Sequence, residues 1–350
     1  MKALSKNERG KGFSLVNQPV RSPLPDEVVL KVLVSTICGS DLHLWEWNDW
    51  ADGFVGSLPL GVGHEMAGEV VDRGGHVEGL SIGAQVSVET HFWCGSCATC
   101  QRGLFHLCAA GGILGFHHDG AFAEYVTVPA RNCWGAKEGE NPLTTSLKEP
   151  FGNAVQTCDV QPLEGRPTLI TGAGPLGLMT VMAAKARGAY PLIVSEPRSE
   201  RREKASMLGA DILLDPSSDS LPEAVWEATE GEGAEVLLEL SGNADALRNG
   251  MAALAPGGDI ALLGLPVRSV EMSLNEDVIF KGATIRGITG RLVWETWKEV
   301  DRLIHHQRVD PSILVTHQFP LEEHEEAFHL MERGVSGKIA FLPHGEIIDE

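Results

Sequence analysis

Four of the seven cysteines lie close enough in sequence to bind one metal ion together. Cys94, Cys97, Cys100 and Cys108 fall within fifteen residues. Four thiolates at this spacing can surround a tetrahedral Zn²⁺ and leave no position for water, which makes such a site structural rather than catalytic. An iron–sulfur cluster and four independent buried thiols are the alternatives. We favour structural zinc, because in a reducing compartment a cysteine cluster indicates a metal more often than disulfides.

A second set of possible metal ligands is dispersed along the first 150 residues. Cys38 begins the run Cys-Gly-Ser-Asp-Leu-His, and His64 and Glu65 follow 26 and 27 residues later. One thiolate, one imidazole and one carboxylate, with water in the fourth position, form an open catalytic zinc site. Spacing alone does not separate them from core residues. Glu149, at the junction of two differently patterned regions, is either a further acid facing this metal or an exposed loop acid.

Residues 168–196 carry the pattern of a dinucleotide-binding unit. An apolar strand over 168–171 leads into Gly-Ala-Gly-Pro-Leu-Gly at 172–177, and a helical run follows. In G-x-G-x-x-G the glycines permit a tight turn, close approach of the pyrophosphate, and close packing of helix on strand. An ordinary glycine-rich turn is the alternative. Glu196 follows the second strand, where a carboxylate can bind the ribose hydroxyls and favours NAD over NADP. Arg201, one of three nearby arginines, is either a cofactor contact or part of a solvated helix face.

The elements that must position these residues change in character near residue 165. Before it, short β-branched runs separated by turn residues predict a compact β barrel or sandwich, at 27–34, 67–71, 84–88 and 121–128. After it, strands alternate with helices and predict a parallel sheet, with strands at 168–171, 192–194, 236–240 and 260–263. Further on we expect helices over 292–304 and 321–331 and a strand over 338–341.

The composition makes several classes of partner improbable. Lys and Arg number 28 against 48 Asp and Glu, which gives a net charge of −20. Because phosphate binding depends on a basic surface, we expect no nucleic-acid partner. No apolar run approaches the roughly 20 residues needed to cross a bilayer, and the N-terminal residues lack the apolar region of a signal peptide. We therefore expect a cytoplasmic protein with no membrane partner.

Together these motifs resemble those of the zinc-dependent medium-chain dehydrogenases. The Cys38 run, Gly-His-Glu, the cysteine cluster and the glycine run occur in the family's order, and the likeness covers nearly the whole chain. The run Pro-Phe-Gly-Asn-Ala-Val at 150–155 separates the chain from most alcohol dehydrogenases. The resemblance implies an α/β protein with a GroES-like β-barrel catalytic domain and a Rossmann doubly wound parallel sheet. The implied boundaries are 1–152 for the catalytic domain, with a structural zinc lobe at about 91–110, then 153–290 for the NAD-binding domain and 291–350 for a segment returning to the catalytic domain.

The resemblance also implies roles for individual residues. Cys38, His64 and Glu65 correspond to catalytic-zinc ligands, and Glu149 falls where the family has an acid near or on the metal. Ser40 and His43 match a proton relay, with Ser40 standing where threonine is usual. Besides the fingerprint residues Gly172, Gly174 and Gly177, the matches to cofactor contacts are Leu176, Glu196, Arg201, Leu263, Gly264, Leu265, Ile288 and Thr289. Gln156 replaces a customary histidine.

The implied activity is an alcohol oxidation that uses NAD and two Zn²⁺ ions per subunit, one catalytic and one structural, usually in a homotetramer. Within the family the motifs favour a small-molecule substrate, L-threonine, whose β-hydroxyl would be oxidised to 2-amino-3-oxobutanoate. A polyol or secondary-alcohol dehydrogenase on the same scaffold is the nearest alternative. A non-catalytic NAD-binding sensor is the third, although a sensor has no need of an open metal site.

Overall fold

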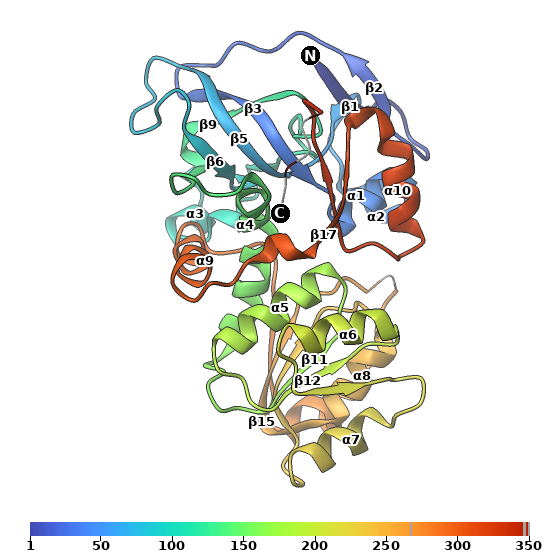
Figure 1. Ribbon diagram of the computed structural model, residues 1–350. Helices are drawn as coiled ribbons and strands as arrows, with labels where there is room; N and C mark the ends of the chain where they lie inside the picture. The colour runs from blue at the N-terminus through green and yellow to red at the C-terminus, as the bar shows by residue number, and fades with distance from the viewer. Residues whose placement is uncertain (267, 346–347, 349–350) are drawn as a thin grey trace. The chain divides into compact units, whose positions relative to one another are not determined.

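The computed structural model describes residues 1–266, 268–345 and 348. The chain forms two compact units, one of Met1–Pro150 with Asp310–Glu350 and one of Phe151–Val309 (Figure 1). Among the described residues, no helix combines the length and apolar character needed to cross a membrane.

The first unit is built on a seven-stranded, mostly antiparallel sheet. Its strands follow the order β10-β6-β5-β3-β18-β17, with β9 also paired to β3. Strand β18 pairs with β3 and so brings the C-terminal segment into the same sheet. The bounds are β3 Glu27–Thr36, β5 Glu65–Arg73, β6 Gln85–Val88, β9 Tyr125–Pro129, β10 Cys133–Gly135, β17 Val315–Phe319 and β18 Lys338–Phe341.

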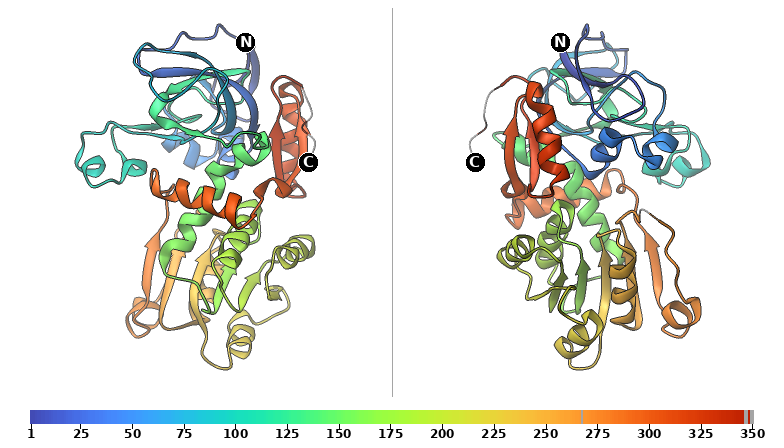
Figure 2. Two further views of the ribbon diagram at one scale, coloured as in Figure 1. Left: turned by 60° about the vertical axis from the view of Figure 1, so that its left-hand side comes forward. Right: turned by 90° about the vertical axis from the view of Figure 1, so that its right-hand side faces the viewer.

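Smaller elements flank this sheet. A three-stranded sheet has the order β2-β1-β4, and β7 pairs with β8. These strands are β1 Lys2–Lys6, β2 Ser14–Asn17, β4 Leu60–Gly61, β7 His91–Phe92 and β8 Gly112–Ile113. The helices are α1 Gly39–Glu46, α2 Asp49–Phe54, α3 Ala98–Gln101 and α10 His324–Glu332, and α4 Pro142–Thr157 runs from this unit into the next. The lobe that contains α3 projects from the β-rich unit (Figure 2).

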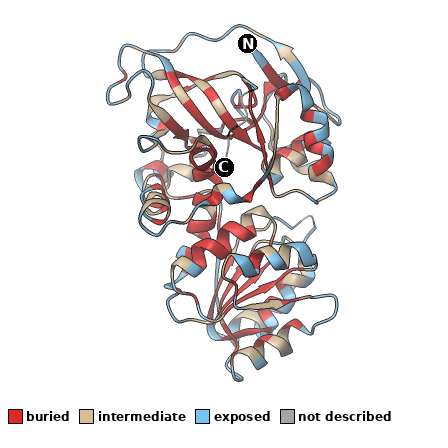
Figure 3. Cartoon of the chain, in the orientation of Figure 1, coloured by how far each residue is buried: buried red, intermediate tan, exposed pale blue. Residues whose placement is uncertain are grey.

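The second unit is a parallel sheet of six strands in the order β13-β12-β11-β14-β15-β16. This is the doubly wound order, in which the chain starts at the centre and reverses direction between β11 and β14. The strands are β11 Thr168–Thr171, β12 Leu192–Ser195, β13 Ile212–Leu214, β14 Ala234–Glu239, β15 Leu254–Leu262 and β16 Thr284–Gly287. The helices are α5 Pro175–Ala186, α6 Ser199–Met207, α7 Leu221–Ala228, α8 Ala244–Ala252 and α9 Glu295–His306. The central strands are buried (Figure 3), because helices pack against them.

The predicted fold class is confirmed, and one strand differs from its prediction in an informative way. The strand expected over 121–128 begins only at Tyr125. Two of the residues before it bond to the turn around Gly63: the N–H of Ala121 donates to the Gly63 carbonyl at 2.9 Å and that of Phe122 to the Val62 carbonyl at 2.8 Å. The next two, Ala123 and Glu124, pair with β1. The segment therefore holds in place the turn that precedes His64.

We expect Gly63→Ala to weaken this turn. Gly63 has a φ of +92°, and a Cβ there would lie 2.4 Å from the Phe122 ring. Strain and overpacking together should lower the free energy of unfolding by about 2 kcal/mol or more. Urea denaturation measures this, with Gly75→Ala as the control because a Cβ at Gly75 meets no atom within 4 Å. Equal stability of the two variants would contradict the prediction.

Candidate functional site

The four clustered cysteines have the geometry of a site for one tetrahedral ion. Their ligand atoms all lie within 4.8 Å of one another. Three sulfur–sulfur distances are 3.6 Å for Cys108–Cys94 and 3.9 Å for both Cys94–Cys100 and Cys97–Cys108. A tetrahedron with metal–sulfur bonds of about 2.3 Å has edges of roughly 3.8 Å, whereas a disulfide needs about 2.05 Å. The backbone N–H groups of Ser96 and Cys97 lower the pKa of Cys94 to about 5, which favours the thiolate that a metal requires.

Cys38, His64 and Glu65 also converge, with ligand atoms within 4.8 Å of one another. Cys38 stands at the N-terminal end of α1, and Glu65 is the first residue of β5. His64 and Glu65 are buried, while Cys38 is half-buried. The three residues bring together the donor types of a catalytic zinc site, so they can hold a divalent cation.

An aspartate lies against Nδ1 of the His64 ring. Nδ1 of His64 lies 3.2 Å from a carboxylate oxygen of Asp41, and the other oxygen of Asp41 accepts a 2.8 Å hydrogen bond from the N–H of Cys38. Burial alone would lower the pKa of His64, but the charge of Asp41, with smaller effects of Cys38, raises it well above its usual value. With Nδ1 directed at Asp41, Nε2 is left as the ring nitrogen for a metal.

A buried lysine, which sequence reasoning missed, neutralises Glu65. Nζ of Lys338 donates to both carboxylate oxygens of Glu65, at 2.6 Å to Oε1, and to the Ile37 carbonyl at 2.9 Å. The hydroxyl of Thr36 also donates to Glu65. Burial would lower the pKa of Lys338, but Glu65, aided by Cys38 and Glu149, raises it. This cation comes from β18, far along the sequence, and reaches the site through the pairing of β18 with β3.

The other predicted residues of the first unit lie on helices. Ser40 and His43 are half-buried on α1, three residues apart and thus on one helix face. Glu149 is 2% exposed on α4. It is therefore not an exposed loop acid, and its charge acts on Lys338. Gln156, at the far end of α4, accepts hydrogen bonds from the N–H of Leu292 and the hydroxyl of Thr296. These two contacts account for a polar side chain at position 156.

In the second unit the glycine run follows β11 and opens α5, as predicted. Gly172 has a φ of +91° and packs against the Ser241 backbone. A Cβ at Gly177 would lie 2.1 Å from the Gly172 carbonyl oxygen, so helix and turn touch there. At Gly174, by contrast, a Cβ would meet only the Arg201 guanidinium, at 3.8 Å. This open space at the N-terminus of α5 fits a pyrophosphate group.

Glu196 connects the fingerprint to the end of β12. One carboxylate oxygen accepts from the N–H of Ala173 at 2.8 Å and the other from that of Arg198 at 3.1 Å. Gly172, Gly174, Glu196 and Arg201 line one cavity of about 510 Å³. Burial lowers the pKa of Arg201, and the charge of Glu196 opposes this shift. The cavity thus offers hydrogen-bonding groups where the ribose of a dinucleotide would lie.

The remaining predicted cofactor residues follow other strands of the same sheet and do not line this cavity. Leu263, Gly264 and Leu265 come after β15, and Ile288 and Thr289 come after β16. Leu176 and Gly177 are in the first turn of α5 and are likewise absent from its lining. All of them nevertheless belong to the carboxyl edge of the parallel sheet or to the helix that starts there, which is where ligands bind in doubly wound folds.

Glu239 is a second residue that sequence reasoning missed. It ends β14, is 2% exposed, and accepts hydrogen bonds from the N–H of Ser241 at 2.9 Å and of Gly242 at 3.1 Å. Burial raises the pKa of Glu239, while these donors oppose the shift. Glu239 thereby shapes the loop that contacts Gly172. An acid inside an apolar strand carries no sequence signal for this role.

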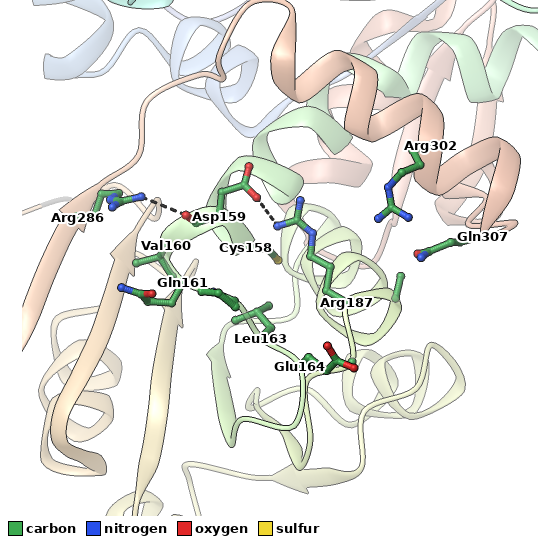
Figure 4. A pocket seen from close by; sticks show the side chains of 13 residues that line it. Cys158, Asp159, Val160, Gln161, Leu163, Glu164, Arg187, Arg286, Arg302 and Gln307 are labelled. Carbon is green, nitrogen blue, oxygen red and sulfur yellow. Dashed lines mark hydrogen bonds and ion pairs between the residues drawn. The ribbon is translucent and has the colours of Figure 1, made fainter.

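A larger cavity of the second unit, about 830 Å³, contains none of the predicted site residues (Figure 4). Two of the three arginines that line it are engaged in ion pairs: Arg187 contacts Asp159 and Glu299, and Arg302 contacts Glu299. Arg286, from β16, donates to the Asp159 carbonyl at 3.1 Å. The paired charges indicate that this cavity is not the catalytic centre.

Comparison with known proteins gives matches along nearly the whole chain. Residues 24–138 match the alcohol dehydrogenase GroES-like domain, and residues 175–306 match the zinc-binding dehydrogenase family. The chain is 46% identical to an L-threonine 3-dehydrogenase of Pyrococcus horikoshii over 98% of each chain. It is similar in structure to a zinc-binding dehydrogenase of Sinorhizobium meliloti bound to NADP, with a TM-score of 0.90 and 27% identity, and to 2R,3R-butanediol dehydrogenase of Bacillus subtilis, with 0.88 and 28%. Both structural matches cover 98% of this chain and 99% of the other.

Cys94→Ser should lower stability and remove one metal ion. Loss of one thiolate opens the tetrahedral site, and we expect the free energy of unfolding to fall by about 2 kcal/mol or more, roughly 5 °C in Tm. Elemental analysis and thermal denaturation measure the two effects. Cys133→Ser, outside both ligand sets, is the control. An unchanged zinc content in Cys94→Ser would contradict the assignment.

Gly174→Ala should weaken dinucleotide binding without weakening the fold. Gly174 has a φ of −63°, which alanine adopts readily, and the space around its Cβ is open. The added methyl group would occupy the space assigned to the pyrophosphate, so we expect Kd for NADH to rise about tenfold, or 1.4 kcal/mol. Fluorescence titration gives the Kd, and thermal denaturation checks the fold. Wild-type affinity in a stable variant would place the phosphates elsewhere.

Proposed function

Because the chain belongs to the zinc-binding dehydrogenases with an alcohol dehydrogenase GroES-like domain, we propose that it oxidises the β-hydroxyl of L-threonine with NAD, giving 2-amino-3-oxobutanoate. The near full-length likeness to an L-threonine 3-dehydrogenase carries the choice of substrate. The convergence of Cys38, His64 and Glu65 supports dehydrogenase chemistry, since these are ligand types of an open catalytic zinc site.

In this proposal each metal-ligand cluster holds one Zn²⁺. The ion in the catalytic cluster supplies a Lewis acid that makes the substrate hydroxyl easier to deprotonate. Asp41 orients His64 for the ion. Both oxygens of Glu65 already accept hydrogen bonds from Lys338, which reduces the charge available to a cation. Glu149 is the second carboxylate that we assign to the metal centre.

NAD, which accepts the hydride, is assigned to the glycine fingerprint. In the proposal Glu196 exchanges its bonds to backbone N–H groups for bonds to the ribose hydroxyls, and its charge disfavours a 2′-phosphate. Arg198 and Arg201 line the same cavity and lessen this discrimination. The preference for NAD over NADP therefore follows from the placement of one buried carboxylate. We also propose that the NAD-binding domain spans residues 153–290, as the family resemblance implies.

We assign the proton path to α1. The Ser40 hydroxyl is the group that exchanges a hydrogen bond with the reacting hydroxyl, and His43 connects it to solvent. Serine supplies the same hydroxyl as the threonine that is usual in the family. Both residues lie on one face of the helix that begins at Cys38, so the helix couples the path to the metal ligand.

A secondary-alcohol dehydrogenase acting on a diol is the second candidate. The structural likeness to 2R,3R-butanediol dehydrogenase favours it, though at lower identity than the threonine enzyme. A non-catalytic NAD sensor is disfavoured, because it would not need buried thiolate, imidazole and carboxylate groups together.

We propose a cytoplasmic homotetramer. Parallel sheets are normally covered on both faces and edges, yet all four residues of β16 are exposed. Among the described residues β16 pairs only with β15, and the neighbouring Leu274, Ile279 and Phe280 are at least 60% exposed. A sheet edge with apolar neighbours supports association with a second copy.

L-Threonine should give the highest kcat/KM in an NAD-reduction assay that includes its diastereomers, sorbitol and 2,3-butanediol. Cys38→Ser should lower kcat by at least about 10³-fold, because a thiolate ligand of the Lewis acid is lost, while NADH binding in the other unit is unchanged. Retained turnover after removal of the catalytic zinc would refute the mechanism. A diol outrunning L-threonine would decide for the second candidate.

A further inference from the structure

The turn between α1 and α2 gives His43 a hydrogen-bond partner that no sequence motif indicates. Asn48 Nδ2 lies 2.6 Å from His43 Nδ1. Trp47 ends α1 in the left-handed conformation, with a φ of 55°, and the N–H of Asn48 donates to the His43 carbonyl at 3.3 Å. The backbone therefore folds back on itself and places the amide against the imidazole. The Trp50 ring, 5.5 Å from the His43 ring, packs beside this pair.

A second contact determines which way the Asn48 amide points. Asn48 is the N-cap of α2, and its Oδ1 accepts a 3.2 Å hydrogen bond from the N–H of Ala51. Because the oxygen faces that donor, the NH₂ group faces His43. An NH₂ group only donates, so Nδ1 of His43 must accept. The hydrogen-bond network thus assigns the proton of the neutral ring to Nε2.

We propose that Asn48 is a positioning residue that keeps His43 in the Nε2–H tautomer, so that His43 meets the proton path as a hydrogen-bond donor. The proposal rests on the proposed function, in which Ser40 and His43 form that path. A ring that already has a proton on Nε2 cannot accept another there. Its free lone pair is on Nδ1, where Asn48 occupies it.

The tautomer has a consequence for the direction of proton transfer. In carbonyl reduction the His43 ring gives its Nε2 proton to the path. The hydrogen bond between Nδ1 and Asn48 breaks, and Nδ1 takes a proton from solvent. In alcohol oxidation the ring must first change to the Nδ1–H tautomer, so that Nε2 is free to take the proton from the path while Nδ1 releases its proton to solvent. Asn48 stabilises the Nε2–H tautomer of His43 and so sets the free-energy cost of converting it to the Nδ1–H tautomer.

Two substitutions of Asn48 keep the N-cap of α2 and change the group that faces Nδ1 of His43. Serine and aspartate are both good N-caps, so α2 is retained in each. The serine side chain of N48S is too short to replace the contact with Nδ1. The carboxylate of N48D presents an acceptor, which requires a proton on Nδ1 and turns Nε2 into an acceptor.

We therefore expect N48D to raise kcat/KM for L-threonine oxidation about tenfold relative to N48S, because N48D leaves Nε2 free to accept the proton that oxidation releases. Thermal denaturation should show similar Tm values for both. An N48D variant no more active than N48S in L-threonine oxidation would overturn the proposal.

A double-mutant cycle separates the tautomer from the added charge of aspartate. In an H43Q background position 43 has no ring tautomer to reverse, so N48D should then change kcat/KM by less than about twofold. A tenfold gain that persists without His43 would mean that charge alone acts, and the proposal would be wrong.

A spectroscopic measurement tests the proposal independently of turnover. In protein with ¹³C-labelled histidine, the Cδ2 resonance of His43, assigned by its absence in H43Q, reports which nitrogen is protonated. We expect the Nε2–H signature in the wild type and the Nδ1–H signature in N48D. The same signature in both would overturn the proposal. A wild type that shows the Nε2–H signature but does not oxidise L-threonine would contradict the proposed function alone.

Discussion

The ion pair of Glu65 and Lys338 is the constraint on which the first unit depends. A buried carboxylate is tolerable only when it is paired and hydrogen-bonded, and Glu65 has Lys338 and Thr36 as partners. Lys338 reaches Glu65 because β18 pairs with β3, and β3 pairs with β5. Glu65 therefore has its buried counter-charge only when β18, from the C-terminal segment, is paired into the sheet that holds β3 and β5.

In the second unit, backbone N–H groups rather than a charged side chain face the negative charges. The N-terminus of α5 offers N–H groups and open space beside Gly174, which suits an anionic pyrophosphate. The acids nearby, Glu196 and Glu239, are both buried and both accept backbone N–H donors. These bonds hold the loops around the fingerprint, and those of Glu239 are kept when Glu196 exchanges its own for the ribose hydroxyls. Preformed loops reduce the ordering cost of binding.

Local patterns in the sequence predicted the fold class and the order of elements, because apolar periodicity and glycine spacing act within a few residues. The strands Thr168–Thr171 and Lys338–Phe341 were found at their expected limits. The segment 121–124 was predicted as strand and is not, because its backbone groups bond partly to residues near Gly63 and partly to β1. Lys338 and Glu239 were missed as site residues, since a polar residue in an apolar strand shows its partner only after folding. Asn48 was not predicted as a site residue, because its contact with His43 depends on the reversal of the chain at Trp47.

The open edge of β16 has a consequence for handling the protein. Within the described part of the chain, its four solvent-facing residues have a paired strand on one side only, and the other side is a template onto which any extended segment can add. A variant designed to be monomeric by charge repulsion elsewhere would leave this template uncovered. When concentrated, such a variant should precipitate or form linear polymers, unless a proline or lysine is also introduced on β16 to block strand pairing at this edge.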